Sequence, residues 1–132
     1  MVLRHSTVTK HIGLGIILAL CLCFCISPVY AEKVPTRITL AVTPDHPSPG
    51  MPYTITGTLT SDEGDLLGNK RVILEATSSD PAEEASFVYI AMDDTNPNGM
   101  FSFFRPRVNG ERAVRVVFLG NSRFDDAVSS VM

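Results

Sequence analysis

The sequence predicts an all-β fold, an antiparallel β-sandwich of about seven strands preceded by a hydrophobic N-terminal segment. After Ala31, no stretch keeps a helical period of apolar residues. Instead, short runs of alternating apolar and polar residues are separated by glycine, proline, aspartate and asparagine. These separators recur at intervals of roughly 8–12 residues, which is typical of a small sandwich.

The N-terminal segment indicates export. Arg4 and Lys10 precede an uninterrupted apolar stretch over residues 12–26, and a small-x-small triplet follows at residues 29–31. Signal peptidase recognises this combination of a basic start, an apolar core and small residues. We therefore expect residues 1–31 to be a signal peptide and the protein to be secreted or held at the cell surface. The alternative is an uncleaved membrane anchor, although a spanning helix needs about 20 apolar residues and Ser27-Pro28 would end the helix directly after this shorter stretch.

Residues 32–132 are long enough for one domain and too short for two. Without the N-terminal segment, nine basic residues face 14 acidic ones, a formal charge of −5. An acidic body without a basic cluster lacks the electrostatic footprint of a nucleic-acid-binding protein, and we expect membrane contact only through an uncleaved N-terminal segment. All three cysteines lie within residues 12–26. The exported domain therefore has neither a disulfide nor a thiolate for catalysis or metal binding.

Alternation defines three strands in the first half of the domain, at residues 37–43, 53–60 and 70–77. A proline-rich loop ends the first strand, because proline donates no hydrogen bond to a ladder. Gly57 falls on the apolar face of the second strand, where a missing side chain permits close packing or a bulge. The positions expected to face the core are Ile38, Leu40 and Val42, then Tyr53, Ile55 and Leu59, and finally Val72, Leu74 and Ala76.

In the second half, residues 78–85 are expected to form a polar loop without an element of its own. Residues 87–92 are apolar on both faces, which predicts a strand packed on both sides and a buried Tyr89. Residues 93–99 are a turn by composition. The remaining strands are expected at residues 100–105, where Phe101 and Phe103 share one face, at residues 113–119, and over a short last run at residues 127–132.

Several motifs follow one another in a fixed order along residues 37–131. They are Thr43-Pro44 with Pro49-Gly50, the alternating run 53–60, a turn glycine before a strand in 67–74, a Gly-x-aromatic-x-aromatic hairpin in 98–103, and Phe-x-Gly-Asn-x-x-aromatic-x-x-small in 118–127. The ordered set resembles the immunoglobulin-like domains of bacterial and archaeal surface and secreted proteins, which often occur in tandem. The resemblance implies an immunoglobulin-like sandwich in a single domain, residues 32–132.

The sequence departs from that family at two places. The family usually carries an aromatic residue, typically tyrosine, where this chain has Arg112, so a tyrosine corner cannot form in the same way. Relatives usually continue beyond the position of Met132 into a longer last strand or another module. A short last strand leaves part of a sheet edge unpaired, and this predicts self-association or a partner strand at that edge.

The sharpest chemical motif is residues 94–99, which match the opening of a calcium loop through Asp94, Asn96 and Asn98. The twelfth position of such a loop is Arg105, where a bidentate carboxylate is required. A hairpin turn explains the Asn98-Gly99 pair fully, because these residues supply the positive φ at which the strands reverse. The three residues remain weak calcium candidates beside that structural interpretation.

Other polar residues indicate no catalytic constellation. His46 is the only histidine after residue 31 and lies in the proline-rich loop, where a solvated residue is expected. The acidic pairs, Asp62 with Glu63 and Asp125 with Asp126, lie in turns, whereas glycosidase chemistry needs two carboxyls across a cleft. Phe104, beside Arg105, is the best single candidate for an interface contact.

We therefore expect an exported, non-enzymatic immunoglobulin-like module with a structural or protein-interaction role at the cell surface, without a catalytic residue or cofactor. Its partner would be a protein or a cell-surface polymer. The alternative is a domain for carbohydrate-dependent or calcium-dependent adhesion. Exposed flat aromatic residues would favour sugar, and calcium-dependent melting would favour the ion.

Overall fold

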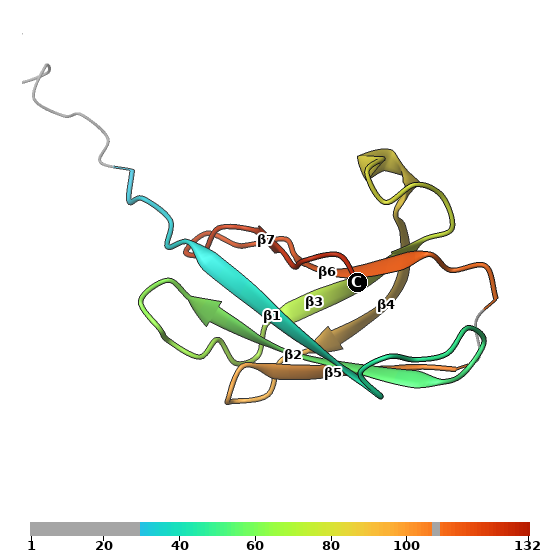
Figure 1. Cartoon of the computed structure of the whole chain (residues 1–132). Coiled ribbons are helices and arrows are strands. Elements are labelled where there is room, and N and C mark those ends of the chain that lie inside the picture. The colour runs from blue at the N-terminus through green and yellow to red at the C-terminus, as the bar shows by residue number, and fades with distance from the viewer. Residues whose placement is uncertain (1–29, 107–108) are drawn as a thin grey trace, which may run out of the picture. The chain divides into compact units, whose positions relative to one another are not determined.

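The computed structural model describes residues 30–106 and 109–132. These residues form two antiparallel sheets that pack as an all-β sandwich, and residues Glu32–Met132 make one compact unit (Figure 1). The expected signal peptide lies outside the described residues except for its last two. No helix in the described ranges is long and apolar enough to cross a membrane. The elements are β1 (Thr36–Thr43), β2 (Tyr53–Ser61), β3 (Arg71–Thr77), the 3-10 helix η1 (Glu84–Ser86), β4 (Val88–Asp94), β5 (Met100–Arg105), β6 (Ala113–Phe118) and β7 (Ala127–Val128).

One sheet has the order β1-β2-β5, with both pairs antiparallel. Its inner face carries the predicted apolar positions, and Ile55 and Leu59 are completely buried. Its outer face is lined with threonines, and Thr39 and Thr58 on neighbouring strands are joined through their hydroxyls at 3.3 Å. The alternation in the sequence therefore assigns these two faces correctly.

The other sheet has the order β4-β3-β6-β7, also antiparallel throughout. Val72 and Leu74 on β3 and Val116 on β6 are completely buried and belong to the core. β6 is buried along all six of its residues, on its outer side as well as on its core side. The core is closed by apolar residues from both sheets, without a disulfide among the described residues.

Gly57 makes room for an aromatic ring on the inner face of the three-stranded sheet. It lies opposite Phe101 in the β2–β5 register, and the Phe101 ring covers it. A Cβ atom at Gly57 would lie 2.3 Å from Phe101 Cζ and 2.5 Å from the backbone oxygen of Thr39. The predicted need for a missing side chain is confirmed, since the aromatic ring occupies the space of the absent one.

The loop between β3 and β4 differs from the expected plain loop, because it contains η1. The Ser86 hydroxyl organises this segment: it donates to the backbone oxygen of Glu83 at 2.7 Å and accepts from the Thr77 hydroxyl at 2.8 Å. A single polar side chain thus ties the helical turn to the end of β3. Sequence composition alone gives no sign of that contact.

Strand β4 corrects two further expectations. Tyr89 was expected to be buried, yet it is 55% exposed, because β4 is an edge strand whose outer side has no covering layer at that point. The strand also continues to Asp94, which leaves a shorter turn than the expected residues 93–99. Apolar composition on both faces therefore does not indicate burial on both faces here.

The last strand is shorter than residues 127–132. Regular pairing stops at Val128, because the Ser129 hydroxyl accepts the Val116 N–H at 2.9 Å and takes the place of a backbone partner. Pairing then resumes, and Val114 and Met132 exchange two backbone hydrogen bonds of 3.0 Å. The edge of β6 is therefore covered from Val114 onward, in contrast to the expectation of an unpaired stretch.

We predict that Gly57→Ala destabilises the domain by at least about 2 kcal/mol, because an added methyl group overpacks a site closed by backbone and an aromatic ring. Urea unfolding of residues 32–132 measures this change. Thr56→Ala, on the outer face of the same strand, is the matched control and should cost less than about 1 kcal/mol. Equal losses for the two variants would contradict the packing argument.

Candidate functional site

The three weak calcium candidates lie at and just after the end of β4. The Asp94 carboxylate faces Arg71 and accepts its Nε–H at 3.1 Å. The Asn96 side-chain oxygen instead accepts two backbone N–H groups, from Asn98 at 2.9 Å and from Met100 at 3.0 Å. Asp94 and Asn96 are thus engaged with different partners. In the ranges the structure describes, no three His, Cys, Asp or Glu side chains are grouped as a metal site.

We predict that Asn96→Ala destabilises the domain by about 1–2 kcal/mol, because two backbone donors in the turn lose their acceptor. Asn98→Ala, at the exposed tip of the same turn, should cost less than about 0.5 kcal/mol. Thermal unfolding gives the loss of stability of each variant. The same measurement, repeated with calcium and with EDTA, tests the metal hypothesis. A calcium-dependent midpoint that Asn98→Ala removes would reassign these residues from turn to ligand.

The other polar candidates are not brought together. Asp62 and Glu63 follow the end of β2, and Asp125 lies beside Val34, whose backbone oxygen accepts its N–H at 2.9 Å. His46 is exposed in the loop that precedes the start of β2. The histidine and the Asp62–Glu63 pair therefore lie at opposite ends of the same strand, roughly 25 Å apart.

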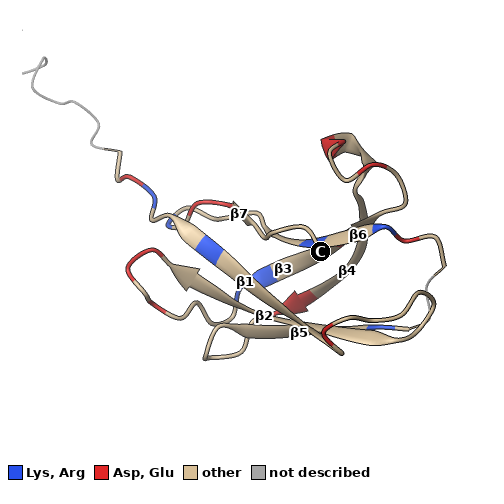
Figure 2. Ribbon diagram, viewed as in Figure 1, with Lys and Arg blue, Asp and Glu red and all other residues tan. Residues whose placement is uncertain are grey.

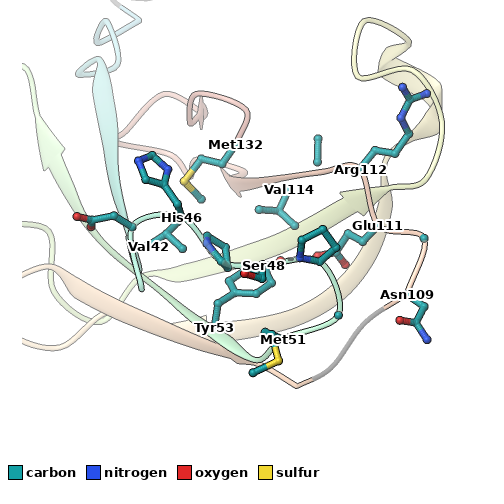
Figure 3. A pocket seen from close by; sticks show the side chains of 16 residues that line it. Val42, His46, Ser48, Met51, Tyr53, Asn109, Glu111, Arg112, Val114 and Met132 are labelled. Atoms are coloured by element: carbon teal, nitrogen blue, oxygen red, sulfur yellow. Dashed lines mark hydrogen bonds between the residues drawn. The ribbon is translucent and has the colours of Figure 1, made fainter.

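A cavity of about 650 Å³ opens between the β1–β2 loop and the start of β6. Val114 and Met132 lie across it from Tyr53 and Met51, and His46 lies at one end (Figure 3). Its volume falls within the usual range for small-ligand pockets. The sequence gives no sign of this cavity, because residues from both halves of the domain line it.

Tyr53 and Glu111, which line this cavity, form a connected polar group with Arg105. The Tyr53 hydroxyl donates to one carboxylate oxygen of Glu111, and Arg105 donates to the other. Burial raises the pKa of the Tyr53 hydroxyl to about 12, and the hydrogen bond to Glu111 acts in the same direction. Arg112, the residue next to Glu111, is exposed. Because Tyr53 begins β2 and Glu111 precedes β6, the hydrogen bond between them holds these two segments together.

We predict that the fold loses stability as the pH rises from 10 towards 12, because the Tyr53 hydroxyl ionises at about pH 10 in the unfolded chain and at about 12 in the folded one. Below pH 10 this contribution is fully present. Tyr53→Phe should remove this part of the alkaline loss, with urea unfolding at pH 8 to 11.5 as the measurement. Tyr89→Phe removes an exposed hydroxyl and serves as the control. An unchanged profile for Tyr53→Phe would contradict the assignment.

The outer side of the four-stranded sheet carries an apolar row that crosses all of its strands. In the strand registers, Met92 lies opposite Ile73, Ile73 opposite Val117, and Val117 opposite Val128. Met92 and Val128 are 50% and 51% exposed. Leu119, 71% exposed, directly follows β6 and lines a shallow hollow of about 390 Å³ with Ile73. We call Met92, Ile73, Val117, Val128 and Leu119 the apolar face.

Charged residues flank the apolar face on both sides. At the start of β3, Arg71 forms an exposed ion pair with Asp94. Towards the end of β3, the buried Arg115 donates to Glu75 and to Glu84, each at 2.7 Å. Its guanidinium also lies 4.1 Å from the centre of the Phe87 ring. The loop that contains η1 is thereby held against that end of the sheet.

Phe104, expected as an interface contact, is 68% exposed on the outer side of the other sheet. It lies opposite Thr54 in a surface that consists mainly of threonine and serine. Its exposure is as expected, but no apolar row surrounds it among the described residues. The apolar face of the four-stranded sheet is a second candidate surface. The alternation in the sequence did not reveal it, because that pattern was used to assign core positions only.

No protein-family model matches the chain, and no curated protein has a significantly similar sequence. The proposed function therefore rests on the residues and their geometry.

Proposed function

We propose that the chain is an exported, non-enzymatic immunoglobulin-like module with a structural or protein-interaction role at the cell surface. The apolar face carries this proposal. Met92, Val128 and Leu119 are half exposed or more around the less exposed Ile73 and Val117, and a group of exposed apolar side chains marks an interaction site. The export signal expected at residues 1–31 supports the location.

The strand order supports the immunoglobulin-like part of the proposal. Strands β1, β2 and β5 share one sheet, and β3, β4, β6 and β7 share the other. Constant-type immunoglobulin domains place the first, second, fourth and fifth strands together, opposite the third, sixth and seventh. This arrangement differs only in the fourth strand, which pairs with the third. Such sandwiches share their architecture more widely than any one topology.

The groups around the cavity support a non-enzymatic role. Both carboxylate oxygens of Glu111 already accept hydrogen bonds from the protein, one from Tyr53 and one from Arg105, whereas a general base must face the proton that it removes. His46 is exposed on the rim, and catalysis by an acid–base pair needs partners within hydrogen-bond distance. The polar group of Tyr53, Glu111 and Arg105 therefore serves to hold the start of β2 to the segment before β6.

The cavity also favours a second candidate function, the binding of a small ligand such as a sugar unit. Tyr53 provides an aromatic surface, and its hydroxyl and Glu111 provide hydrogen-bonding groups beside apolar walls. This second function would use the loop end of the sandwich. The apolar face would remain free for a protein partner.

A photo-crosslinking amino acid placed at Met92 in the full chain tests the interaction role in the cells that produce it. We expect a discrete adduct on the exported form, whose N-terminus should be Glu32. Met100 is equally exposed, at 50%, on the other sheet and is the matched control position. Equal labelling at the two positions, or a chain retained uncleaved inside the cell, would contradict the proposal.

A further inference from the structure

We propose that Asn109 is a modification site, at which spontaneous deamidation converts the Asn109-Gly110 pair to aspartate and isoaspartate. The chain contains a second asparagine-glycine pair, Asn98-Gly99, which the fold protects. This inference goes beyond the proposed function and does not depend on it. It rests on the different surroundings of the two glycines.

Deamidation at such a pair needs only water as a co-reactant, and asparagine is a chemically labile residue. The Gly110 backbone nitrogen loses its proton to water and attacks Cγ of Asn109, so that an N–Cγ bond forms and the Cγ–Nδ2 bond breaks. The Nδ2 group takes up a proton and leaves as ammonia, and a cyclic imide remains. Water then opens the ring, at Cγ to give aspartate or at the backbone carbonyl carbon to give isoaspartate. The net reaction exchanges ammonia for water without oxidation or reduction, and it adds one negative charge.

The attack requires the glycine nitrogen to reach the side-chain carbon of the asparagine in a reactive geometry. The peptide group between the two residues must therefore be able to rotate. A backbone that is hydrogen-bonded and packed reacts only after local opening, whereas an exposed loop opens at almost no cost in free energy. Both asparagines are exposed, so the glycines decide between the two pairs.

Gly99 is held on both sides of its backbone. Its N–H donates to the backbone oxygen of Asn96 at 2.8 Å, and its oxygen accepts the Leu59 N–H at 2.8 Å. The glycine is buried, and a Cβ atom there would lie 2.7 Å from the Leu59 oxygen. The Asn98 N–H also donates, to the Asn96 side-chain oxygen at 2.9 Å. Rotation of the peptide group between Asn98 and Gly99 would break these contacts, so this pair stays unreactive.

Gly110 has open surroundings. It is exposed, and apart from its chain neighbours no atom of the described residues lies within 4 Å of the position that an added Cβ would take. Its φ of 81° is a conformation that glycine adopts without strain. Asn109 and Gly110 both lie outside the strands. Packing therefore does not prevent the Gly110 nitrogen from approaching Cγ of Asn109.

The modification makes one end of the sandwich more acidic. Asn109 lies at the edge of the cavity (Figure 3), and its side-chain oxygen lies close to Gly50 of the β1–β2 loop. Figure 2 shows acidic residues in that loop and before β6, and Asp45 and Glu111 of these two segments both line the cavity. Deamidation adds a third carboxylate beside them.

Isoaspartate also changes the backbone, because the chain then runs through Cγ and gains a methylene group. This change falls two residues before Glu111, whose carboxylate accepts the hydrogen bond from Tyr53. We expect the isoaspartate form to hold the start of β2 less firmly than the unmodified chain.

Peptide mapping of residues 32–132, the compact unit that contains the whole core, tests the inference. After incubation at mildly alkaline pH, trypsin separates the two pairs, because cleavage after Arg107 and Arg112 releases residues 108–112. An unincubated sample is the reference. We expect Asn109 to deamidate at least about tenfold faster than Asn98 in the folded protein. In guanidinium chloride the two should react at comparable rates, since the protection of Asn98 depends on the fold.

Two results of this mapping would overturn the proposal. One is a folded protein in which Asn98 reacts as fast as Asn109 or faster. The other is a preference for Asn109 that persists unchanged in guanidinium chloride, because local sequence rather than the fold would then decide the site.

Variants test the cause of the protection. Asn96→Ala should speed deamidation at Asn98 severalfold and leave Asn109 unchanged, because the turn around Gly99 loses the acceptor of two backbone N–H groups. Asn121→Ala is the matched control, since its side-chain oxygen also accepts two backbone N–H groups, but in a different turn. It should leave both rates unchanged. An Asn98 rate that Asn96→Ala does not raise would contradict protection by this turn.

Thermal unfolding tests the effect on the start of β2. The isoaspartate form, separated by chromatography, should melt at a lower temperature than Asn109→Asp, which carries the same charge without the added methylene. Equal midpoints would overturn the loosening of Tyr53, whereas the mapping decides separately whether Asn109 is the modification site.

Discussion

The arrangement of the four-stranded sheet depends on the burial of β6 on both of its faces. Its core side packs against the other sheet, as expected for a central strand, but its outer side carries Arg115. A buried guanidinium costs several kcal/mol unless it is paired and hydrogen-bonded. Glu75 and Glu84 supply the pairs and Phe87 supplies a ring face, and the pairing with Glu84 lowers the pKa of that carboxyl. One cation thus holds the β3–β4 loop on the sheet.

That contact divides the outer side of the sheet into two parts. The part near the end of β3 is closed by the chain's own loop, which leaves acidic side chains at its rim. In the other part, Val117 is buried and Ile73 is partly buried, and the row that they join reaches the surface at its ends, Met92 and Val128. The packing that stabilises β6 thus leaves exposed apolar side chains beside charged ones on this side of the sheet, and these side chains carry the proposed interaction role.

The sequence predicted the strands and the core well, because the direction of a side chain in a strand is a local property with a period of two. Leu74 and Phe103 were assigned to the core from alternation alone, and Gly57 was recognised as a position of close approach. The candidate surfaces were harder. The outer row runs across four strands that are distant in sequence. Nothing in the sequence around Glu111 indicates that its carboxylate accepts a hydrogen bond from Tyr53. Such contacts depend on sheet order and register.

What the sequence determined by itself was the all-β class, the positions of the strands and the face of each strand that turns inward. Alternation, turn residues and proline act over a few neighbouring residues, so a single chain displays them directly. Only the tertiary structure decided that β4 is an edge strand, that Tyr89 is exposed and that Arg115 is buried beside the loop containing η1. These outcomes depend on which strands pair and on which loop covers them. Pairing joins segments that are distant in sequence, so it produces no periodic pattern that the sequence alone could show.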